Sequence, residues 1–177
     1  MAMELRPVGF WAKVAPDGRL DEPRLPRPQD CVDPAWQLTC AGRATAAYIS
    51  RAGCLESYEL AYATCRFVGC TAPARELGCA TMTDGVWLWP EGLLHYLRAH
   101  AVRPPEGFVQ HLCAAAAKDW GHLPPCVDCG LAACPARVTW PLRHHLQWDE
   151  AARAPIPMPR GTAAYLARVS TLRDVVR

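Results

Sequence analysis

The chain has 177 residues, of which 51% are hydrophobic and 20% are charged. This length suits one domain with a real core, or one domain with a small appended module, and the composition excludes a wholly disordered chain. The formal net charge is +2 at pH 7, so the sequence excludes recognition of nucleic acid or of an anionic membrane by overall charge.

Ten cysteines are the most informative feature of the composition. The N-terminal segment has no apolar stretch of signal-peptide length, and no stretch reaches the roughly 18 apolar residues that span a bilayer. We therefore expect a cytoplasmic protein without a membrane partner. Because reducing compartments keep thiols free, metal binding explains so many cysteines better than a disulfide framework does.

The first third of the chain divides into an arm and a helical region. Five prolines among residues 1–30 predict an extended arm, because their spacing blocks a helix and a central strand. We expect Phe10 and Trp11 to anchor this arm to the body. Asp33 followed by Pro34 then predicts a helix start, and apolar residues recur at helical spacing until Gly53. An extended segment is expected over residues 58–67.

The middle of the chain predicts a turn, a strand and two helices. Residues 83–85 have turn chemistry, and the β-branched and aromatic residues 86–89 predict a short strand. Pro90 and Glu91 predict the start of a helix that ends before Pro104. A second helix is expected from about 106 to 120, with Phe108, Leu112 and Ala116 on its inner face.

The last third is predicted to be irregular over residues 126–160, which are dense in Cys, Pro and Trp. A final amphipathic helix is expected from Thr162. Trp87 and Trp89 would share one face of the predicted strand, where we expect them to be core residues; the alternative is a stacking platform for a base, a peptide or a partner.

Two cysteines and two histidines form the first candidate metal site. Cys65 and Cys70 belong to a loop, whereas His95 and His100 lie on the helix that follows the predicted strand, and zinc suits such mixed sulfur and nitrogen ligands. The two histidines are about 140° apart on an ideal helix, so they share an ion only if the last turn tightens or unwinds. Otherwise His100 is a helix-capping cation and His95 an ordinary residue.

A resemblance points to the same residues. The segments CRFVGC and ELGCATMTDGVWLWPEGLLHYLRAHAVRPPEGFVQHL, with DPAW upstream, are similar to a group of uncharacterised bacterial proteins that carry DPxW, CRxCG and LTDGxWxWPEGLxHYxxxHxVRLP. The resemblance covers about residues 30–112 and implies a fold unit around a CxxC and two histidines, here Cys65, His95 and His100. It implies no activity. Val68 stands where the pattern has its second cysteine, so either Cys70 or Cys79 replaces it or the site lacks a ligand.

A second candidate zinc site follows in the C-terminal third. Cys126, Cys129 and Cys134 have metal-ligand spacing, and His144 is the expected fourth ligand. The competing fourth ligands are His111, His122 and Cys113.

Two other interpretations of this cluster compete with metal binding in a closed site. A redox CxxC normally begins a helix that follows a strand, and Cys134 with the nearby histidines favours metal instead. A zinc deaminase is the other alternative, because Pro125-Cys126-Val127-Asp128-Cys129 matches PCxxC and Cys54-Leu55-Glu56 imitates the upstream half of that signature. No αβα pattern surrounds either half.

The sequence therefore predicts an α+β protein, a mostly helical small domain with a short β-hairpin or strand-helix zinc-binding unit and a Cys-rich irregular C-terminal segment. We expect an arm over 1–30, a zinc-binding core domain over 31–123, and a Cys/His-rich segment with a C-terminal helix over 124–177. One or two structural Zn²⁺ ions would stabilise it.

Closed four-ligand sites leave no open coordination position, which favours a protein-interaction or accessory module over an enzyme. The first alternative is a nucleic-acid-binding accessory protein that uses the Arg-rich C-terminal third. The second alternative is a zinc-dependent enzyme of the deaminase kind.

Overall fold

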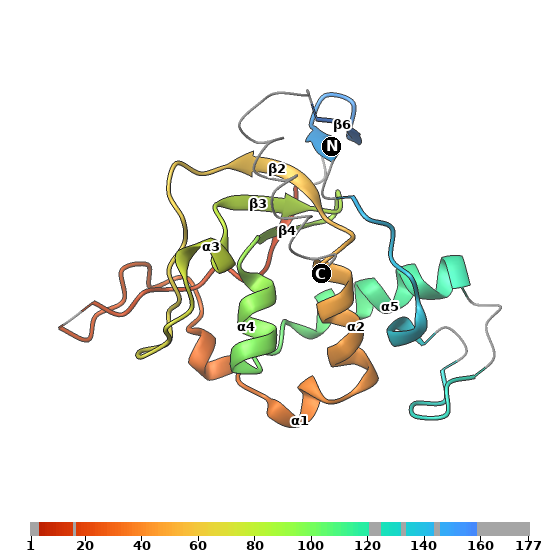
Figure 1. Cartoon of the computed structure of the whole chain (residues 1–177), viewed down its shortest axis with the longest axis horizontal. Coiled ribbons are helices and arrows are strands. Elements are labelled where there is room, and N and C mark those ends of the chain that lie inside the picture. The colour runs from red at the N-terminus through yellow and green to blue at the C-terminus, as the bar shows by residue number, and fades with distance from the viewer. Residues whose placement is uncertain (1–3, 16, 121–124, 132–133, 144–145, 159–177) are drawn as a thin grey trace.

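The computed structural model describes residues 4–15, 17–120, 125–131, 134–143 and 146–158. They form a mixed six-stranded sheet with helices packed below it in Figure 1. In chain order the elements are β1 (Arg6–Pro7), η1 (Pro28–Cys31), α1 (Pro34–Gln37), α2 (Cys40–Ile49), β2 (Cys54–Tyr58), α3 (Ala74–Leu77), β3 (Ala80–Thr83), β4 (Trp87–Pro90), α4 (Leu93–His100), α5 (Glu106–Trp120), η2 (Pro135–Arg137), β5 (Leu146–Asp149) and β6 (Ala154–Pro157).

The sheet has the strand order β1-β4-β3-β2-β5-β6. Its centre is the antiparallel β2-β3-β4 ribbon, whereas β1 joins β4 and β5 joins β2 in parallel. Asp84 forms the β3–β4 turn, since its Oδ1 atom accepts hydrogen bonds from the backbone N–H groups of Val86 (2.9 Å) and Trp87 (2.7 Å). The order of strand and helix is as predicted, but the helix start expected at Pro90 is wrong, because Pro90 pairs with Thr81 in β4 and α4 begins at Leu93.

The core lies between the sheet and helices α2, α4 and α5. Trp89 is fully buried at 0% exposure, and Phe108, Leu112 and Ala116 of α5 are buried with it. Trp87 is buried as well, and its ring meets Phe108 edge-on with centroids 5.3 Å apart. The expectation that both tryptophans belong to the core is confirmed, and neither forms an exposed stacking platform.

The predicted helix from Asp33 to Gly53 is wrong in one respect, because it is two helices. Asp33 caps α1 by accepting a hydrogen bond from the N–H of Trp36 at 2.9 Å. Thr39 caps α2 in the same way, with its Oγ1 atom 3.1 Å from the N–H of Gly42. A second side-chain cap in mid-segment starts a new helix, and it places Cys40 in the first turn of α2.

The C-terminal part differs from the expectation of a mostly helical domain with an irregular tail. Residues 146–157 contribute the antiparallel β5–β6 hairpin, so the six-stranded sheet does not support the description as mostly helical. Prolines in β6 concealed this strand in the sequence, but β6 is an edge strand, where a missing N–H is tolerated. The helix expected from Thr162 lies outside the described residues.

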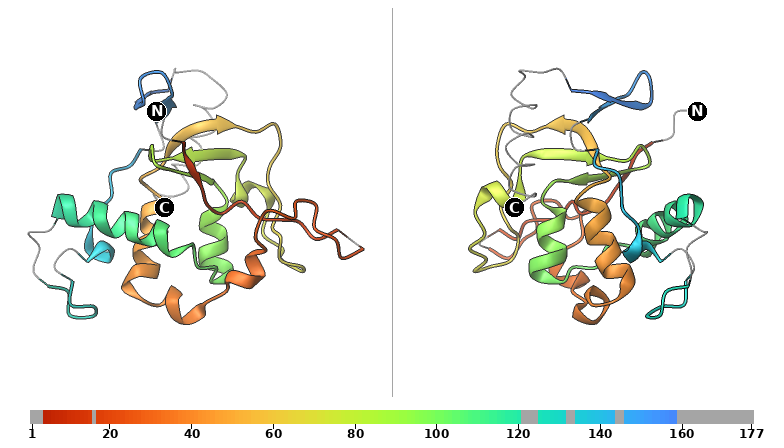
Figure 2. Two further views of the ribbon diagram at one scale, coloured as in Figure 1. Left: turned by 180° about the vertical axis from the view of Figure 1, so that it is seen from behind. Right: turned by 45° about the vertical axis from the view of Figure 1, so that its right-hand side comes forward.

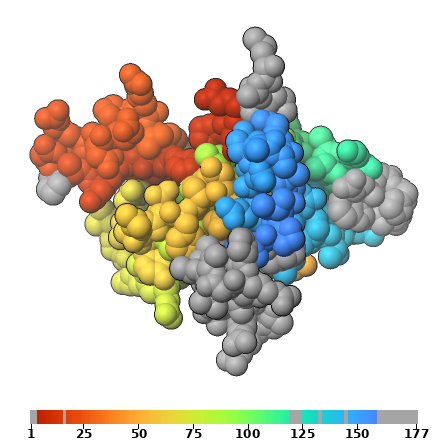
Figure 3. Space-filling model, turned by 90° about the horizontal axis from the view of Figure 1, so that it is seen from above, coloured from red at the N-terminus to blue at the C-terminus, as the bar shows by residue number. Residues whose placement is uncertain are grey.

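The N-terminal arm extends away from the body, as Figures 2 and 3 show, but it is anchored at its base. Trp11 is buried, and its ring lies 5.8 Å from that of Tyr96. Farther out, Val14 and Leu20 form an isolated antiparallel bridge. Within the residues that the structure describes, every helix is too short or too polar to cross a lipid bilayer.

Candidate metal centres

The structure brings Cys65, Cys70, His95 and His100 together, and we call this group the cysteine–histidine site. Their four ligand atoms all lie within 4.8 Å of one another. The two histidine Nε2 atoms are 3.2 Å apart, and the sulfur-to-nitrogen distances are 3.3 Å for Cys65–His100 and 3.6 Å for Cys70–His95. Tetrahedral zinc with its usual bond lengths gives about 3.3 Å between nitrogens and about 3.6 Å between sulfur and nitrogen. The observed spacings match those of a single tetrahedral ion.

The end of α4 explains how two histidines five residues apart reach one point. The N–H of Ala101 bonds to the carbonyl of Tyr96, five residues back, and Ala101 adopts the left-handed conformation with φ 52°. A hydrogen bond over five residues closes a wider turn than the four-residue bond of an α-helix. The last turn is therefore unwound, and His100 rotates towards the face that carries His95.

The other ring nitrogen of His95 meets a carboxylate. Its Nδ1 atom lies 2.9 Å from Oε1 of Glu76 in α3, and the His95 side chain is buried. This contact favours a proton on Nδ1 and leaves the Nε2 lone pair free to bind a metal. The pattern is that of a metal-ligating histidine held by a carboxylate, and Glu76 was not identified from the sequence.

Gly92 makes this arrangement possible. A Cβ atom at Gly92 would come within 2.8 Å of the carbonyl oxygen of Leu77, so only glycine lets α3 approach the start of α4. The close approach brings Glu76 to His95. Gly92, in the segment WPEGLLHY, is thus needed for the packing of α3 against α4, which the local sequence does not reveal.

Cys65 and His100 are also fixed by their surroundings. The N–H of Phe67 points at the Cys65 sulfur at 3.4 Å, and the Phe67 ring stacks on that of His100 with centroids 3.9 Å apart. Burial raises the pKa of Cys65, and burial likewise lowers the pKa of His100, so without a cation both groups favour their neutral forms. A bound dication would favour the Cys65 thiolate and use the neutral His100 ring directly.

The structure places Cys70, and neither Val68 nor Cys79, beside Cys65 and the two histidines. The Val68 side chain is fully exposed at 104%, and Cys70 is the second cysteine of the group. Cys79 lies outside it and donates its backbone N–H to Glu91 at 3.2 Å.

The second group consists of Cys40, Cys126, Cys129 and Cys134, and we call it the four-cysteine site. Their sulfur atoms lie within 4.8 Å of one another. Cys40, in the first turn of α2, was not among the candidate ligands that the sequence indicated. A signal existed, since Cys40 follows the helix-capping Thr39 and so lies at the positive end of α2, but 86 positions separate it from Cys126.

The turn after Cys126 points backbone N–H groups at the Cys126 sulfur. These N–H groups, from Asp128 first and then Cys129, lower the pKa of Cys126 to about 7. Gly130 closes the turn with φ 71°, and its N–H donates to the carbonyl of Cys126 at 2.7 Å. Burial raises the pKa of Cys134 to about 12, so a cation is needed to hold both sulfurs as thiolates.

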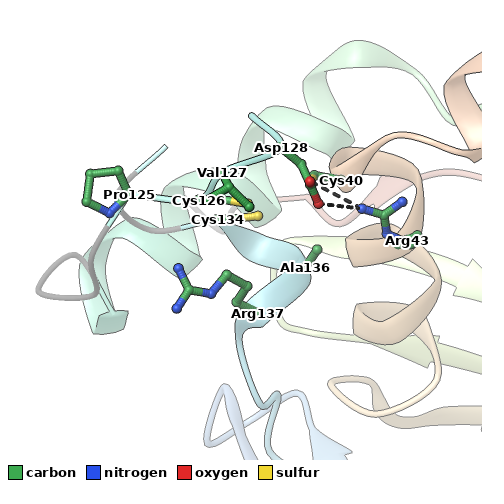
Figure 4. Close-up of a pocket in the computed structure, with 9 residues that line it drawn as sticks. All are labelled: Cys40, Arg43, Pro125, Cys126, Val127, Asp128, Cys134, Ala136 and Arg137. Atoms are coloured by element: carbon green, nitrogen blue, oxygen red, sulfur yellow. Dashed lines mark hydrogen bonds and ion pairs between the residues drawn. The ribbon is translucent and has the colours of Figure 1, made fainter. Parts of the chain in front are cut away.

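Arg43 and Asp128 flank the four-cysteine site, as Figure 4 shows. The Arg43 Nη2 atom lies 3.4 Å from the Cys40 sulfur and 3.4 Å from Oδ2 of Asp128. Arg43 also donates to the carbonyl of Leu38 at 2.7 Å. These contacts link the Cys126–Cys129 turn to α2.

Among the remaining candidate ligands that the structure describes, His111 and Cys113 belong to neither group. His144 and His122 lie outside the described residues. His111 lies 2.9 Å from Asp84, and Cys113 is outside the four-cysteine site. Cys54, the upstream half of the deaminase interpretation, is buried and its thiol bonds to the carbonyl of Thr83 at 3.1 Å.

No protein-family profile, curated protein or solved structure matches this chain. The interpretation of both groups therefore rests on their geometry.

Proposed function

We propose that this is a structural-zinc protein in which two Zn²⁺ ions hold a small α+β domain together as an interaction or accessory module. The observation that carries the proposal is the geometry of the cysteine–histidine site, with sulfur-to-nitrogen distances of 3.3 Å and 3.6 Å around a His95–His100 pair 3.2 Å apart. Two imidazole nitrogens and two sulfurs at these spacings suit zinc more than harder cations, which prefer oxygen ligands.

The number of ligands supports a structural role. Each group supplies four cysteine or histidine atoms, which fill a tetrahedral ion and leave no position for water or substrate. Each group also joins segments far apart in the chain, since Cys65 meets His100 and Cys40 meets Cys126. Ions so placed would stabilise the fold as cross-links do.

An interaction role is supported by apolar side chains exposed beside the metal ligands. Val68 lies between Cys65 and Cys70 and is fully exposed, and Val127 between Cys126 and Cys129 is 101% exposed. Leu60 and Tyr62 are exposed in the segment that leads to Cys65. These side chains would lose water contact on binding a protein partner.

Metal content is the direct test. Protein purified without added metal, digested and assayed by inductively coupled plasma mass spectrometry, should contain about two equivalents of zinc. Less than about half an equivalent would contradict the proposal. Near one equivalent would restrict it to a single site.

Salt dependence separates the interaction module from the nucleic-acid alternative. Binding to DNA or RNA that weakens steeply as salt rises would favour the Arg-rich C-terminal third, whereas salt-insensitive binding of a protein would favour the interaction module. The deaminase alternative lacks support because Cys54 lies outside both groups.

A further inference from the structure

The four cysteines of the four-cysteine site differ in their access to solvent. Cys40, Cys126 and Cys134 are buried, whereas Cys129 is exposed. Its neighbour Val127 is fully exposed, so the turn from Cys126 to Cys129 lies at the surface. Cys129 is thus the residue of this group that solvent and small oxidants can approach, and the sulfur of Cys126 lies within 4.8 Å of the Cys129 sulfur.

The cysteine–histidine site lacks this combination. Its two cysteines, Cys65 and Cys70, are half-buried, and its other two ligands are imidazoles, which are not on the thiol oxidation ladder. The Phe67 ring lies flat against His100 and covers that side of the site. Exposure of the thiolate controls how fast a cysteine is oxidised, so the two sites should differ in sensitivity.

We propose, on the basis of the proposed zinc occupancy, that Cys129 is an oxidation site through which hydrogen peroxide opens the four-cysteine site and releases its zinc. The Cys129 thiolate attacks the peroxide, so that an S–O bond forms, the O–O bond breaks and hydroxide leaves. The Cys126 thiolate then attacks that sulfur, forming the Cys126–Cys129 disulfide and expelling a second hydroxide. The two thiolates lose two electrons, the peroxide gains them, and two protons from solvent convert the hydroxides to water.

Release of the ion would remove the connection that it makes between α2 and residues 126–134. Cys40 belongs to α2, and the other three cysteines belong to residues 126–134, so the ion joins these two segments. A Cys126–Cys129 disulfide removes two of the four ligands and leaves Cys40 and Cys134 too few to hold zinc tightly. The links that would remain are the packing of Cys40 against Cys126 and Cys134 and the Arg43–Asp128 ion pair at 3.4 Å, whose side chains are largely exposed.

The test treats the zinc-loaded full-length protein with hydrogen peroxide and follows zinc release with a chromogenic chelator, while alkylation and mass spectrometry identify the oxidised cysteines. We expect about one equivalent of zinc to leave at least about tenfold faster than the second, with Cys126 and Cys129 as the first disulfide. Equal release from both sites, or a first disulfide without Cys129, would overturn the proposal.

Two variants that each remove one thiol test the role of Cys129. Cys129→His should retain two zinc ions and lose the fast release, because imidazole binds zinc but is not oxidised by this route. Cys79→Ser removes a thiol outside both groups and should retain the fast release. Fast release from Cys129→His would refute the role of Cys129. Untreated protein that lacks zinc would instead refute the proposed function, so the two failures are distinguishable.

Discussion

Asp84 joins three elements through its two carboxylate oxygens. One oxygen accepts the N–H groups that form the β3–β4 turn, and the other meets the hydroxyl of Tyr48 in α2 and Nε2 of His111 in α5 at 2.9 Å. The Asp84 side chain is only 6% exposed. The sequence could predict Asp84 as a turn residue because turn chemistry is local. It could not predict Tyr48 and His111 as partners, since these contacts span 36 and 27 positions.

These contacts make the stability of the fold depend on the charge of Asp84. Burial alone would raise the pKa of Asp84, but hydrogen bonds from His111, Trp87 and Tyr48 outweigh burial and lower this pKa below its usual value. A carboxylate with a lowered pKa in the folded state stabilises above its unfolded pKa of about 3.9, and the contribution is lost as pH falls through the folded pKa.

We therefore expect Asp84→Asn to lower the free energy of unfolding at pH 7 by about 2–3 kcal/mol, because an amide leaves His111 and Tyr48 imperfectly paired. Urea denaturation from pH 7 to pH 2.5 measures this, and the difference from the wild type should shrink below about pH 4. Asp17→Asn is the matched control at an exposed position and should change stability by less than about 0.5 kcal/mol. A difference that stayed constant down to pH 2.5 would contradict the assigned charge.

Among the helices and strands, the sequence predicted those for which the local signals agree and missed those for which the signals compete. The turn at 83–85, the strand that follows and the presence of α4 were predicted because turn residues, aromatic residues and helical apolar spacing agree there, although α4 begins at Leu93 and not at Pro90, and α5 has the predicted bounds. The break between α1 and α2 was missed because apolar spacing continues through it while Thr39 starts a new helix. The β5–β6 hairpin was missed because proline disfavours a strand except at an edge, and edges are a property of the whole sheet.

A substitution at Gly92 tests the packing of α3 against α4. Gly92→Ala would place a methyl group 2.8 Å from the Leu77 carbonyl, which forces α3 away and withdraws Glu76 from His95. We expect a loss of about 1–3 kcal/mol in unfolding free energy and weaker zinc retention at the cysteine–histidine site, measured by urea denaturation and by competition with a chelator.

Gly107→Ala is the control for that substitution. Gly107 lies in α5, and a Cβ atom there would meet nothing closer than the Trp87 ring at 3.9 Å. Alanine at this helical position should be neutral or should stabilise by up to about 1 kcal/mol, without any effect on zinc. If Gly92→Ala and Gly107→Ala had the same effects on unfolding free energy and zinc retention, Gly92 would not be required for close packing of α3 against α4.

Along the whole chain, the cysteine–histidine site and the four-cysteine site join segments of different sequence separation. The four residues of the cysteine–histidine site lie within 36 residues of one another, from the Cys65–Cys70 loop to the end of α4, so the sequence pattern could group them, with Cys79 left open as an alternative to Cys70. The four-cysteine site depends on Cys40, which the fold of the first half brings to the C-terminal cysteines. Local spacing grouped Cys126, Cys129 and Cys134 and added His144, which lies outside the described residues, whereas Cys40 joins the three cysteines only through the packing of α2.

This difference predicts separable losses of structure, which hydrogen exchange with mass spectrometry can locate. Cys40→Ala should remove about one equivalent of zinc and accelerate exchange in residues 125–137 and the first turn of α2, while α4 keeps its protection. His95→Ala should remove the other equivalent and accelerate exchange in residues 65–78, where Cys65, Cys70 and Glu76 lie.

If Cys40→Ala left exchange in 125–137 unchanged, Cys40 would not join the two segments through an ion. If either variant lost both ions with uniform loss of protection, the two sites would be one cooperative unit.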